Sequence, residues 1–429
     1  MARPIPRIVR ASATPILIGD PPLLNVLGVH QPYTPRCIVE VETDEGAIGV
    51  GETYGDTEYL TLATTLAESV VGQPVTALNG LTDLAYSAAG LADDAAAEFD
   101  PAGLRGRRTK TKLVRSVVSA FEIASLDALG TTLGLPVHAL LGGKVRDAVE
   151  YSGYLFYRWA NHPVDAAPVD DWGAALDPEG VVAQAKRFAT DYGFGSFKLK
   201  GGVFPPDEEI AAIKALARAF PGQLLRLDPN GGWTVATSVR VANDLDGTLE
   251  YLEDPTPGVT GMAEVRHRTG ALLATNMVVT SFEEIPAAFA ADAVQVVLSD
   301  HHYWGGLTAT RELAAHCRTY GVALSMHSNT HLGISLAAMT HVASVVPELR
   351  YACDTHRPWQ TEDVITEPHV FRNGAVDVSD SPGLGVELDR DALATLHERW
   401  QRMDARDRDD VAAMRIAEPE WTQPPLPRW

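Results

Sequence analysis

The central part of the chain repeats one short pattern, in which a run of apolar and β-branched residues ends in a polar or charged residue. Seven such runs end at positions 200, 228, 253, 276, 300, 327 and 354, so successive ends are about 23 to 28 residues apart. That spacing fits one strand plus one helix per repeat. An earlier run that ends at Tyr154 makes eight strands. The pattern predicts an α/β fold built on a (β/α)8 barrel, whose catalytic groups lie at the carboxyl ends of the strands.

The intervals between these runs carry helical patterns. Residues 178–192 follow a capping Asp177, and residues 307–320 end before Gly321. Both segments have the start and stop signals of helices. The interval from Tyr154 to Lys200 is longer than the others, which predicts an insertion at residues 160–177 that could serve as a lid.

The sequence before the repeats has a different character. Residues 37–51 alternate between apolar and polar positions around a Thr-Asp-Glu-Gly turn, as a β-hairpin does. Helical patterning begins near Thr57. Apolar residues at three- and four-residue steps predict a long helix over residues 114–128, ended by Gly130 or Gly134. We therefore expect an α+β domain ahead of the barrel.

After the last repeat the chain returns to mixed structure. Residues 375–378 read as a strand, and residues 389–400 read as a helix. This segment is too small to fold alone. We expect an α+β N-terminal capping domain over residues 1–135, the barrel over residues 136–370, and a C-terminal segment, 371–429, that completes the capping domain.

Composition narrows the functional class. Apolar residues make up 45% of the chain and charged residues 21%, which is typical of a folded globular protein. The 35 Lys and Arg against 56 Asp and Glu give a net charge of −21, which argues against binding to nucleic acid or to an anionic membrane. An anionic substrate must then be held by local cations.

The cysteines and the apolar runs bear on the compartment. Cys37, Cys317 and Cys353 are far apart and form no C-x-x-C motif, so we expect a reducing cytoplasm and neither a disulfide framework nor a cysteine metal site. The longest apolar stretch near the N-terminus, Pro15–Ile18, is shorter than a signal-peptide core, and no run approaches a membrane span. We expect neither secretion nor membrane insertion.

Two lysines stand at the end of one predicted strand. Lys198 and Lys200 are two residues apart, so their side chains point to the same face. Ammonium groups that lie close oppose each other's protonation, which lowers a pKa towards neutrality and makes one lysine a usable base. The alternative is that Lys198 and Lys200 lie on an exposed strand at the surface. Their place at a strand end of the predicted barrel favours the active-site interpretation.

The next three strand ends carry oxygen ligands. Asp228, Glu253 and Asn276 offer only carboxylate and amide oxygens, the donors that a hard divalent ion such as Mg²⁺ prefers. Each of them alone could be a helix N-cap. Three in succession favour a metal site.

Asp300 and His327 end the following two strands. A carboxylate on one imidazole nitrogen fixes the tautomer and raises the basicity of the other nitrogen. A buried structural Asp–His pair is the alternative. His327 and His331 also have the four-residue spacing of a zinc pair, but no H-E-x-x-H motif is present, so zinc receives little weight.

A lysine base, a three-residue magnesium set and an Asp–His dyad on successive strands resemble the enolase superfamily, and within it the glucarate dehydratase family. The resemblance extends over nearly the whole chain. Its most specific segments are Phe197-Lys-Leu-Lys-Gly-Gly202, Leu227-Asp-Pro-Asn-Gly231, Glu253-Asp-Pro255, Ala274-Thr-Asn-Met277, His327-Ser-Asn329, Asp354-Thr-His356 and Pro382-Gly-Leu-Gly385. Most of the superfamily carries a carboxylate where Asn276 stands.

The resemblance implies removal of water from an acid sugar through an ene-diolate intermediate. By similarity, Lys200 acts on one epimer, and His327, paired with Asp300, acts on the other and protonates the departing hydroxyl. Lys198 contacts the reacting carboxylate and keeps Lys200 neutral. The implied substrate is a small dicarboxylic sugar acid, D-glucarate with L-idarate as a second substrate, and the implied product is 5-dehydro-4-deoxy-D-glucarate.

The resemblance also implies the other ligands of the site. Mg²⁺ is held by Asp228, Glu253 and Asn276, and an amide in place of a third carboxylate leaves the ion more attractive to a substrate anion. The positions that match the family's substrate-binding residues are His30, Tyr154, Asn230, Asn329, His356 and Arg408. We further expect a homo-oligomer.

One position departs from the family. A substrate-binding threonine is expected just before the long helix, but Arg108 stands there, with Thr109 one residue further on. The loop at residues 96–112 is also unlike that of the family. The exact substrate is therefore less secure than the type of reaction.

Three other readings stay open. A site with two bases could epimerise its substrate without loss of water. Galactarate or another hexarate could replace glucarate. A catalytically silent relative that only binds sugar acids would have no need for bases on both faces, so the retention of Lys200 and His327 argues against it.

Overall fold

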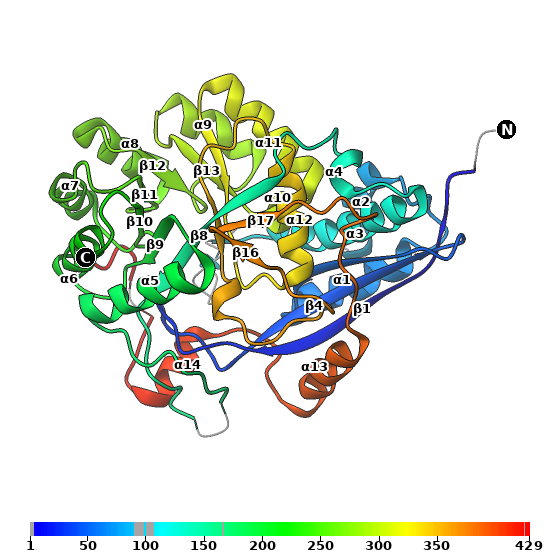
Figure 1. Cartoon of the computed structure of the whole chain (residues 1–429), viewed down its shortest axis with the longest axis horizontal. Helices are drawn as coiled ribbons and strands as arrows, with labels where there is room; N and C mark the ends of the chain where they lie inside the picture. Colours follow the sequence, from blue (N-terminus) through cyan, green and yellow to red (C-terminus); the bar gives the residue numbers. More distant parts are fainter. Residues whose placement is uncertain (1–3, 90–97, 100–106, 165–166, 424) are drawn as a thin grey trace.

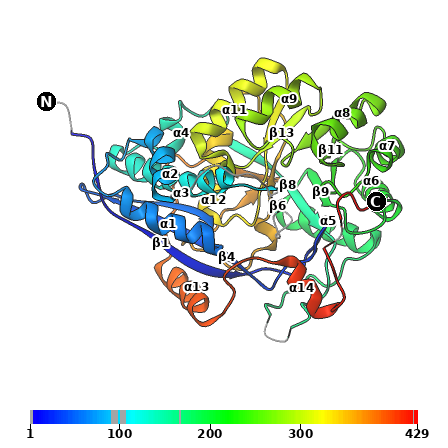
Figure 2. The same cartoon turned by 180° about the vertical axis from the view of Figure 1, so that it is seen from behind.

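The computed structural model describes residues 4–89, 98–99, 107–164, 167–423 and 425–429 (Figures 1 and 2). Near the N-terminus, three antiparallel strands form a sheet in the order β1 (Ile8–Gly19), β4 (Tyr33–Thr43) and β5 (Ile48–Tyr54). The β4–β5 pairing confirms the predicted hairpin. Short pairs are formed by β2 (Leu24–Asn25) with β3 (Gly28–Val29) and by β6 (Glu98–Phe99) with β7 (Arg107–Arg108).

Helices cover one face of this sheet. They are α1 (Thr57–Ser69), the 3-10 turn η1 (Leu78–Gly80), α2 (Leu81–Ala89) and α3 (Lys110–Leu133). The predicted long helix is confirmed as α3, which starts earlier than expected and ends at Gly134 with φ 68°. Gly49 and Gly51 lie directly against α3, where a Cβ atom would clash with a backbone oxygen of the helix. The two glycines therefore let the sheet and α3 come into backbone contact.

Eight parallel strands form the barrel and confirm the predicted repeat. They are β8 (Ala148–Phe156), β9 (Ser196–Lys200), β10 (Leu224–Asp228), β11 (Tyr251–Glu253), β12 (Leu273–Thr275), β13 (Val296–Ser299), β14 (Ala323–Met326) and β15 (Cys353–Thr355). Each pairs with its neighbour in sequence from β8 to β14, and β15 pairs with β8. A bridge between Leu324 and Leu349 joins the remaining seam.

Helices connect the strands and enclose the main hydrophobic core. They are α4 (Val137–Leu140), α5 (Pro178–Tyr192), α6 (Pro206–Ala219), α7 (Val235–Asp244), α8 (Gly258–Thr269), η2 (Phe282–Glu284), α9 (Ile285–Ala290), α10 (His301–Trp304), α11 (Leu307–Tyr320), α12 (Gly333–Ser344) and η3 (Arg357–Trp359). The predicted bounds of α5 and α11 are confirmed, with Asp177 accepting a hydrogen bond from the Gly180 amide as the N-cap of α5.

The insertion before α5 packs against the barrel. In its described part, Arg158 is 2.9 Å from Asp170, and the ring centroids of Trp172 and Trp359 are 4.7 Å apart. A lid function for residues 160–177 stays a prediction.

The C-terminal segment contacts both the barrel and the N-terminal sheet. Strands β16 (Phe371–Arg372) and β17 (Ala375–Asp377) form a hairpin, and β17 pairs antiparallel with the start of β8. The position of β17 matches the strand predicted at residues 375–378. Helices α13 (Arg390–Arg402) and α14 (Asp410–Ala417) then lie near the N-terminal strands in both views (Figures 1 and 2). His397 of α13 forms a 2.7 Å hydrogen bond with the Pro15 carbonyl. The division at residues 135 and 370 stays a prediction.

Two features relate to the expected compartment. The three cysteines are buried free thiols. Within the ranges that the structure describes, no helix is long and apolar enough to cross a bilayer.

Candidate active site

The polar strand ends meet at one rim of the barrel because the strands are parallel and in register. Lys200 lies beside Asp228 in the β9–β10 register, and Glu253 ends the next strand. Nζ of Lys200 is 2.6 Å from Oδ2 of Asp228. Nζ of Lys198 lies 2.8 and 2.9 Å from the two carboxylate oxygens of Glu253. The structure thus brings both lysines together with two of the three expected metal ligands.

A further carboxylate, Asp354, belongs to this cluster. Its Oδ2 is 2.6 Å from Nζ of Lys198, and its Oδ1 is 3.6 Å from the guanidinium of Arg226. All of these side chains are buried. The sequence predicts no role for Asp354 beyond its place in the Asp354-Thr-His356 motif, although its position at a polar strand end was a usable signal.

The electrostatics of the cluster are set by burial and by its ion pairs. Burial alone would lower the pKa of Lys198, but the charges of Asp354 and Glu253 outweigh it and raise that pKa, so Lys198 carries a positive charge. Burial and the charge of Asp228 raise the pKa of Glu253 well above its usual value. Burial also acts against ionised Asp228, but the charges of Lys200 and Lys198 lower its pKa. Lys198 is thus the charged member of the pair, and the expectation that the other lysine, Lys200, is a usable base stays a prediction.

The residues expected to hold Mg²⁺ fit a divalent ion. Carboxylates outnumber lysines in the cluster, and both amide atoms of buried Asn276 lack a hydrogen-bond partner among the described residues. Asp254 holds this strand end in place, because its Oδ2 accepts a 2.8 Å hydrogen bond from the Asn276 amide N–H and its Oδ1 accepts one from Thr275. An oxygen-rich, acidic site with an unused amide oxygen suits Mg²⁺.

Asp300 and His327 also lie together, after β13 and β14. Oδ2 of Asp300 is 3.4 Å from Nδ1 of His327, and Nε2 of His327 has no hydrogen-bond partner within the described ranges. Burial lowers the pKa of His327, which the hydrogen bond to Asp300 offsets only in part. The imidazole is therefore neutral near pH 7 and has one nitrogen available.

Of three further candidate substrate-binding residues, Tyr154 lies against the lysines, and His356 and His30 follow it through ring contacts. The Tyr154 ring centroid is 4.4 Å from Nζ of Lys198 and 4.6 Å from the His356 ring. Phe156 lies 5.5 Å from His356 and 5.7 Å from His30, between centroids. The Tyr154 hydroxyl, both His356 nitrogens and Nε2 of His30 are buried and have no hydrogen-bond partner in the described part of the chain. These polar atoms are available to a ligand.

Asn329 and Arg408 lie together on another side. Thr330 links them, since its hydroxyl is 3.3 Å from Oδ1 of Asn329 and 3.4 Å from the Arg408 guanidinium. Asp410 forms hydrogen bonds of 3.0 and 3.1 Å with Arg408, and Asp20 lies 3.5 Å away. The positive charge of the Arg408 guanidinium is thus already balanced by the carboxylates of Asp410 and Asp20.

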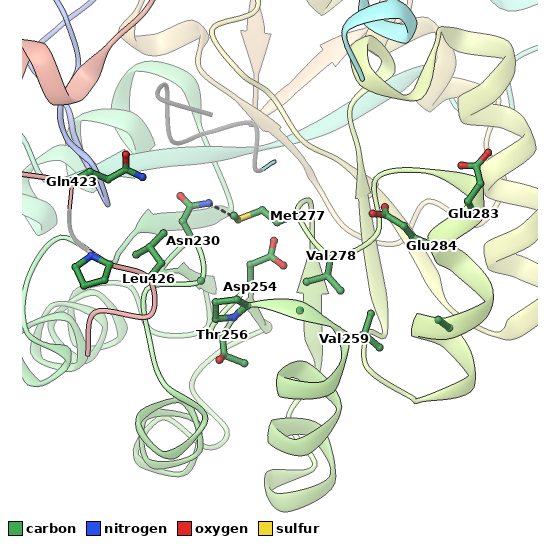
Figure 3. Close-up of a pocket in the computed structure, with 15 residues that line it drawn as sticks. Asn230, Asp254, Thr256, Val259, Met277, Val278, Glu283, Glu284, Gln423 and Leu426 are labelled. Carbon is green, nitrogen blue, oxygen red and sulfur yellow. Dashed lines mark hydrogen bonds between the residues drawn. The ribbon is translucent and has the colours of Figure 1, made fainter. Parts of the chain in front are cut away.

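A cavity of about 890 Å³ opens at the carboxyl ends of β10, β11 and β12 (Figure 3). Asn230 and Met277 line its barrel side, where Nδ2 of Asn230 donates to Sδ of Met277 at 3.2 Å. Gln423 and Leu426 of the C-terminal segment form another wall. Its lining includes Asn230 but neither lysine, so it adjoins the cluster on the side of the metal ligands.

Thr109, which lies one residue beyond the position where the family's threonine is expected, serves the fold. The Thr109 hydroxyl accepts a 3.0 Å hydrogen bond from the Lys112 amide and caps α3. Residues 96–97 and 100–106 of the divergent loop lie outside the described residues.

Comparison with known proteins agrees with this fold and site. Residues 9–142 match the mandelate racemase / muconate lactonizing enzyme N-terminal domain, and residues 180–392 match the enolase C-terminal domain-like family. The chain belongs to the enolase superfamily, and it is an enzyme of that superfamily.

Individual relatives are similar over the full length. The chain is 65% identical over 98% of its length, and 99% of the relative's, to a protein of Streptomyces coelicolor named "Probable glucarate dehydratase". A Thermobispora bispora enolase, solved with magnesium and formate, is 52% identical with a TM-score of 0.94 and covers 99% of this chain and 100% of its own. A Pseudomonas fluorescens enolase, solved with magnesium, potassium and tartrate, is 47% identical with a TM-score of 0.95 and full coverage of both chains. These similarities support an acid-sugar dehydratase.

Proposed function

We propose that this chain is an Mg²⁺-dependent dehydratase that removes water from a hexarate, converting D-glucarate to 5-dehydro-4-deoxy-D-glucarate. The observation that carries the proposal is the buried group of Lys198, Lys200, Asp228 and Glu253 beside the unpartnered amide of Asn276. The 65% identity to a probable glucarate dehydratase and the tartrate bound by the Pseudomonas relative support a hydroxylated diacid as substrate.

The first step removes the proton next to a carboxylate. Lys200, as the free amine after loss of its own proton, takes it from one epimer and Nε2 of His327 takes it from the other, so that D-glucarate and L-idarate share one intermediate. The electron pair of the C–H bond places a second negative charge on the carboxylate, and stabilising that charge is the main demand on the site. Lys198, held positively charged by Asp354 and Glu253, provides part of the stabilisation.

Asp228, Glu253 and Asn276 would hold the metal ion. Bound Mg²⁺ supplies Lewis-acid stabilisation of the substrate carboxylate. The remaining chemistry belongs to the side chains of the chain itself.

The second step breaks the bond between the β-carbon and its hydroxyl. Where His327 took the α-proton, it returns that proton to the departing hydroxyl; for the epimer that Lys200 deprotonates, His327 must first take a proton from solvent. Water then leaves, and the enol that remains rearranges to the keto acid. Tyr154, Asn230, Asn329, His30, His356 and Arg408 bind the rest of the diacid.

The proposal can be tested with purified protein and a panel of D-glucarate, L-idarate and galactarate, with and without a chelator. We expect keto-acid formation from D-glucarate and L-idarate that needs Mg²⁺, and a fall by orders of magnitude in Lys200→Ala for the epimer that Lys200 deprotonates. Interconversion of epimers without keto acid would instead identify an epimerase, turnover of galactarate alone would change the substrate, and binding without turnover would identify a silent relative. Absence of binding and of turnover with every hexarate would reject the proposal.

A further inference from the structure

A chain of hydrogen bonds leads from the N-terminal sheet to the dyad in the barrel. Nε of Arg36, on β4, donates to Oε1 of Glu52 on β5 at 2.9 Å. Glu52 also accepts 3.0 Å hydrogen bonds from the amides of Leu332 and Ser335 at the start of α12. Both charged side chains are at most 1% exposed. Arg36 is therefore fixed in position by groups on both sides of the domain contact.

His302 stands between Arg36 and Asp300. Its Nε2 is 3.1 Å from the Ser335 hydroxyl and 3.4 Å from the guanidinium of Arg36, and its Nδ1 is 2.7 Å from Oδ1 of Asp300. A guanidinium can only donate hydrogen bonds, so Nε2 must be the acceptor and the ring proton must sit on Nδ1. The ring then donates to Asp300.

This arrangement determines which carboxylate oxygen of Asp300 contacts His327. Oδ1 of Asp300 accepts from both Nδ1 and the backbone N–H of His302, at 2.7 and 2.9 Å. Oδ2 lies 3.4 Å from Nδ1 of His327; Nε2 of His331 is equally near, but it makes no hydrogen bond among the described residues. An ionised Asp300 places the His327 proton on Nδ1 and leaves Nε2 unprotonated.

We propose that His302 and Arg36 are positioning residues that act through Asp300 to hold His327 in the tautomer whose Nε2 accepts the substrate proton. The inference rests on the proposed function for its catalytic meaning, but the tautomer itself is a property of the resting protein. It links a side chain of the N-terminal sheet to the proton transfer in the barrel.

The groups around His302 are consistent with a neutral ring. It packs against His301, His331 and Tyr54, with ring centroids 4.3, 4.6 and 5.2 Å away, and it faces Arg36. Burial lowers the pKa of His302 to about 4, although the charge of Asp300 acts in the opposite direction. His331 also faces Asp300, with Nε2 3.4 Å from Oδ2.

A metal ion does not explain this histidine cluster. Nitrogens of His301, His302 and His331 lie within 4.8 Å of one another. Both nitrogens of His302 are already engaged, however, and the positive charge of Arg36 lies against one of them. The hydrogen-bonded network is therefore the better account.

The test uses His302→Phe, which keeps the size of the ring and removes both nitrogens. The matched control is His301→Phe, because His301 is the adjacent buried histidine and neither of its nitrogens has a hydrogen-bond partner in the described structure. ¹⁵N NMR of histidine-labelled full-length protein, with His327 assigned from the spectrum of His327→Gln, reports the tautomer without substrate. We expect the Nδ1–H form in the parent and in His301→Phe, and a shift towards the Nε2–H form in His302→Phe.

Exchange of the α-proton in D₂O gives a second readout. The exchange rate of the epimer that faces His327, relative to that of the epimer that faces Lys200, should fall on the order of 10-fold to 100-fold in His302→Phe, as for other supporting hydrogen bonds. An unchanged His327 tautomer in folded His302→Phe would overturn the inference. A changed tautomer in a protein that turns over no hexarate would uphold the inference and reject the proposed function. If His302→Phe does not fold, Arg36→Lys should shift the His327 tautomer in the same direction by a smaller amount. An unchanged His327 tautomer in Arg36→Lys would then overturn the inference.

Discussion

The two halves of the barrel mouth, at the ends of β9–β11 and of β13–β14, differ in how their charged groups are arranged. On the β9–β11 side, Lys198, Lys200, Asp228 and Glu253 form direct ion pairs with distances of 2.6 to 2.9 Å. On the β13–β14 side, His327 is neutral and its link to Asp300 is longer, at 3.4 Å. The first half is organised to balance charge and the second to keep one nitrogen basic. Substitutions in the two halves should therefore fail in different ways.

The largest effect is expected for Lys198→Met. This change leaves Glu253 and Asp354 buried without their shared cation, and breaking a buried ion pair in this way costs roughly 3–5 kcal/mol of folding free energy. Denaturant unfolding measures the loss. Mg²⁺ should restore part of it, because a ligand that binds only the folded state stabilises that state. Lys186→Met, at an exposed position on α5, is the control, and an equal loss in both variants would refute the electrostatic role.

On the other half, His327→Gln should spare the fold and damage the chemistry. Loss of a general base lowers the rate by about 10²–10⁴-fold. Keto-acid formation and the unfolding midpoint should be measured on the same preparation. Turnover close to that of the parent would show that His327 is not the base.

A smaller effect is expected when the ligand set is altered. Asn276→Asp adds a third carboxylate, which should tighten Mg²⁺ binding by about tenfold, since affinity rises with the charge of the ligands. Asn276→Ala should weaken binding. Calorimetric titration with Mg²⁺ measures the affinity of both variants and of the parent. Equal affinities in all three would contradict the role of Asn276 as a metal ligand.

The smallest effect concerns pH. Burial lowers the pKa of His327, so turnover that depends on neutral His327 should persist as the pH falls through the ordinary imidazole value of 6.5 and decline only below it. The hydrogen bond to Asp300 raises this pKa, so Asp300→Asn should move the decline further towards acid. A kcat/KM profile with its acidic limb above pH 6.5 in the parent would contradict this assignment.

The sequence was sufficient for the barrel because each repeat is encoded locally. A buried run, a polar strand end and a capped helix recur at nearly constant spacing, and parallel strands place their ends at one rim. This rule placed Asp228, Glu253, Asn276, Asp300 and His327 at one rim, as the structure has them, and their roles stay predictions. The hairpin and the long helix were likewise visible from local periodicity and a glycine stop.

Contacts between distant segments could not be predicted in the same way. The pairing of β1 along the whole of β4 leaves no signal in either strand alone. Nothing local indicates that His302 meets Arg36, 266 positions earlier. Arg408 was expected as a cation for the substrate, but nothing near it in the sequence indicates that Asp20 of the N-terminal segment lies 3.5 Å from its guanidinium.

The glycine-mediated contact between β5 and α3 has a consequence for engineering chimeric enzymes. Glu52 directly follows Gly51, which lies against the backbone of α3. The distance between the sheet and α3 therefore also sets the position of the Glu52 carboxylate. That carboxylate accepts hydrogen bonds from the start of α12 and from Arg36. Exchanging the N-terminal half with that of a relative to alter selectivity would therefore transplant a spacing as well as a binding surface. Gly49, Gly51, Arg36 and Glu52 all move with that half, so a functional hybrid needs a barrel whose α12 still presents the amides of Leu332 and Ser335 to Glu52.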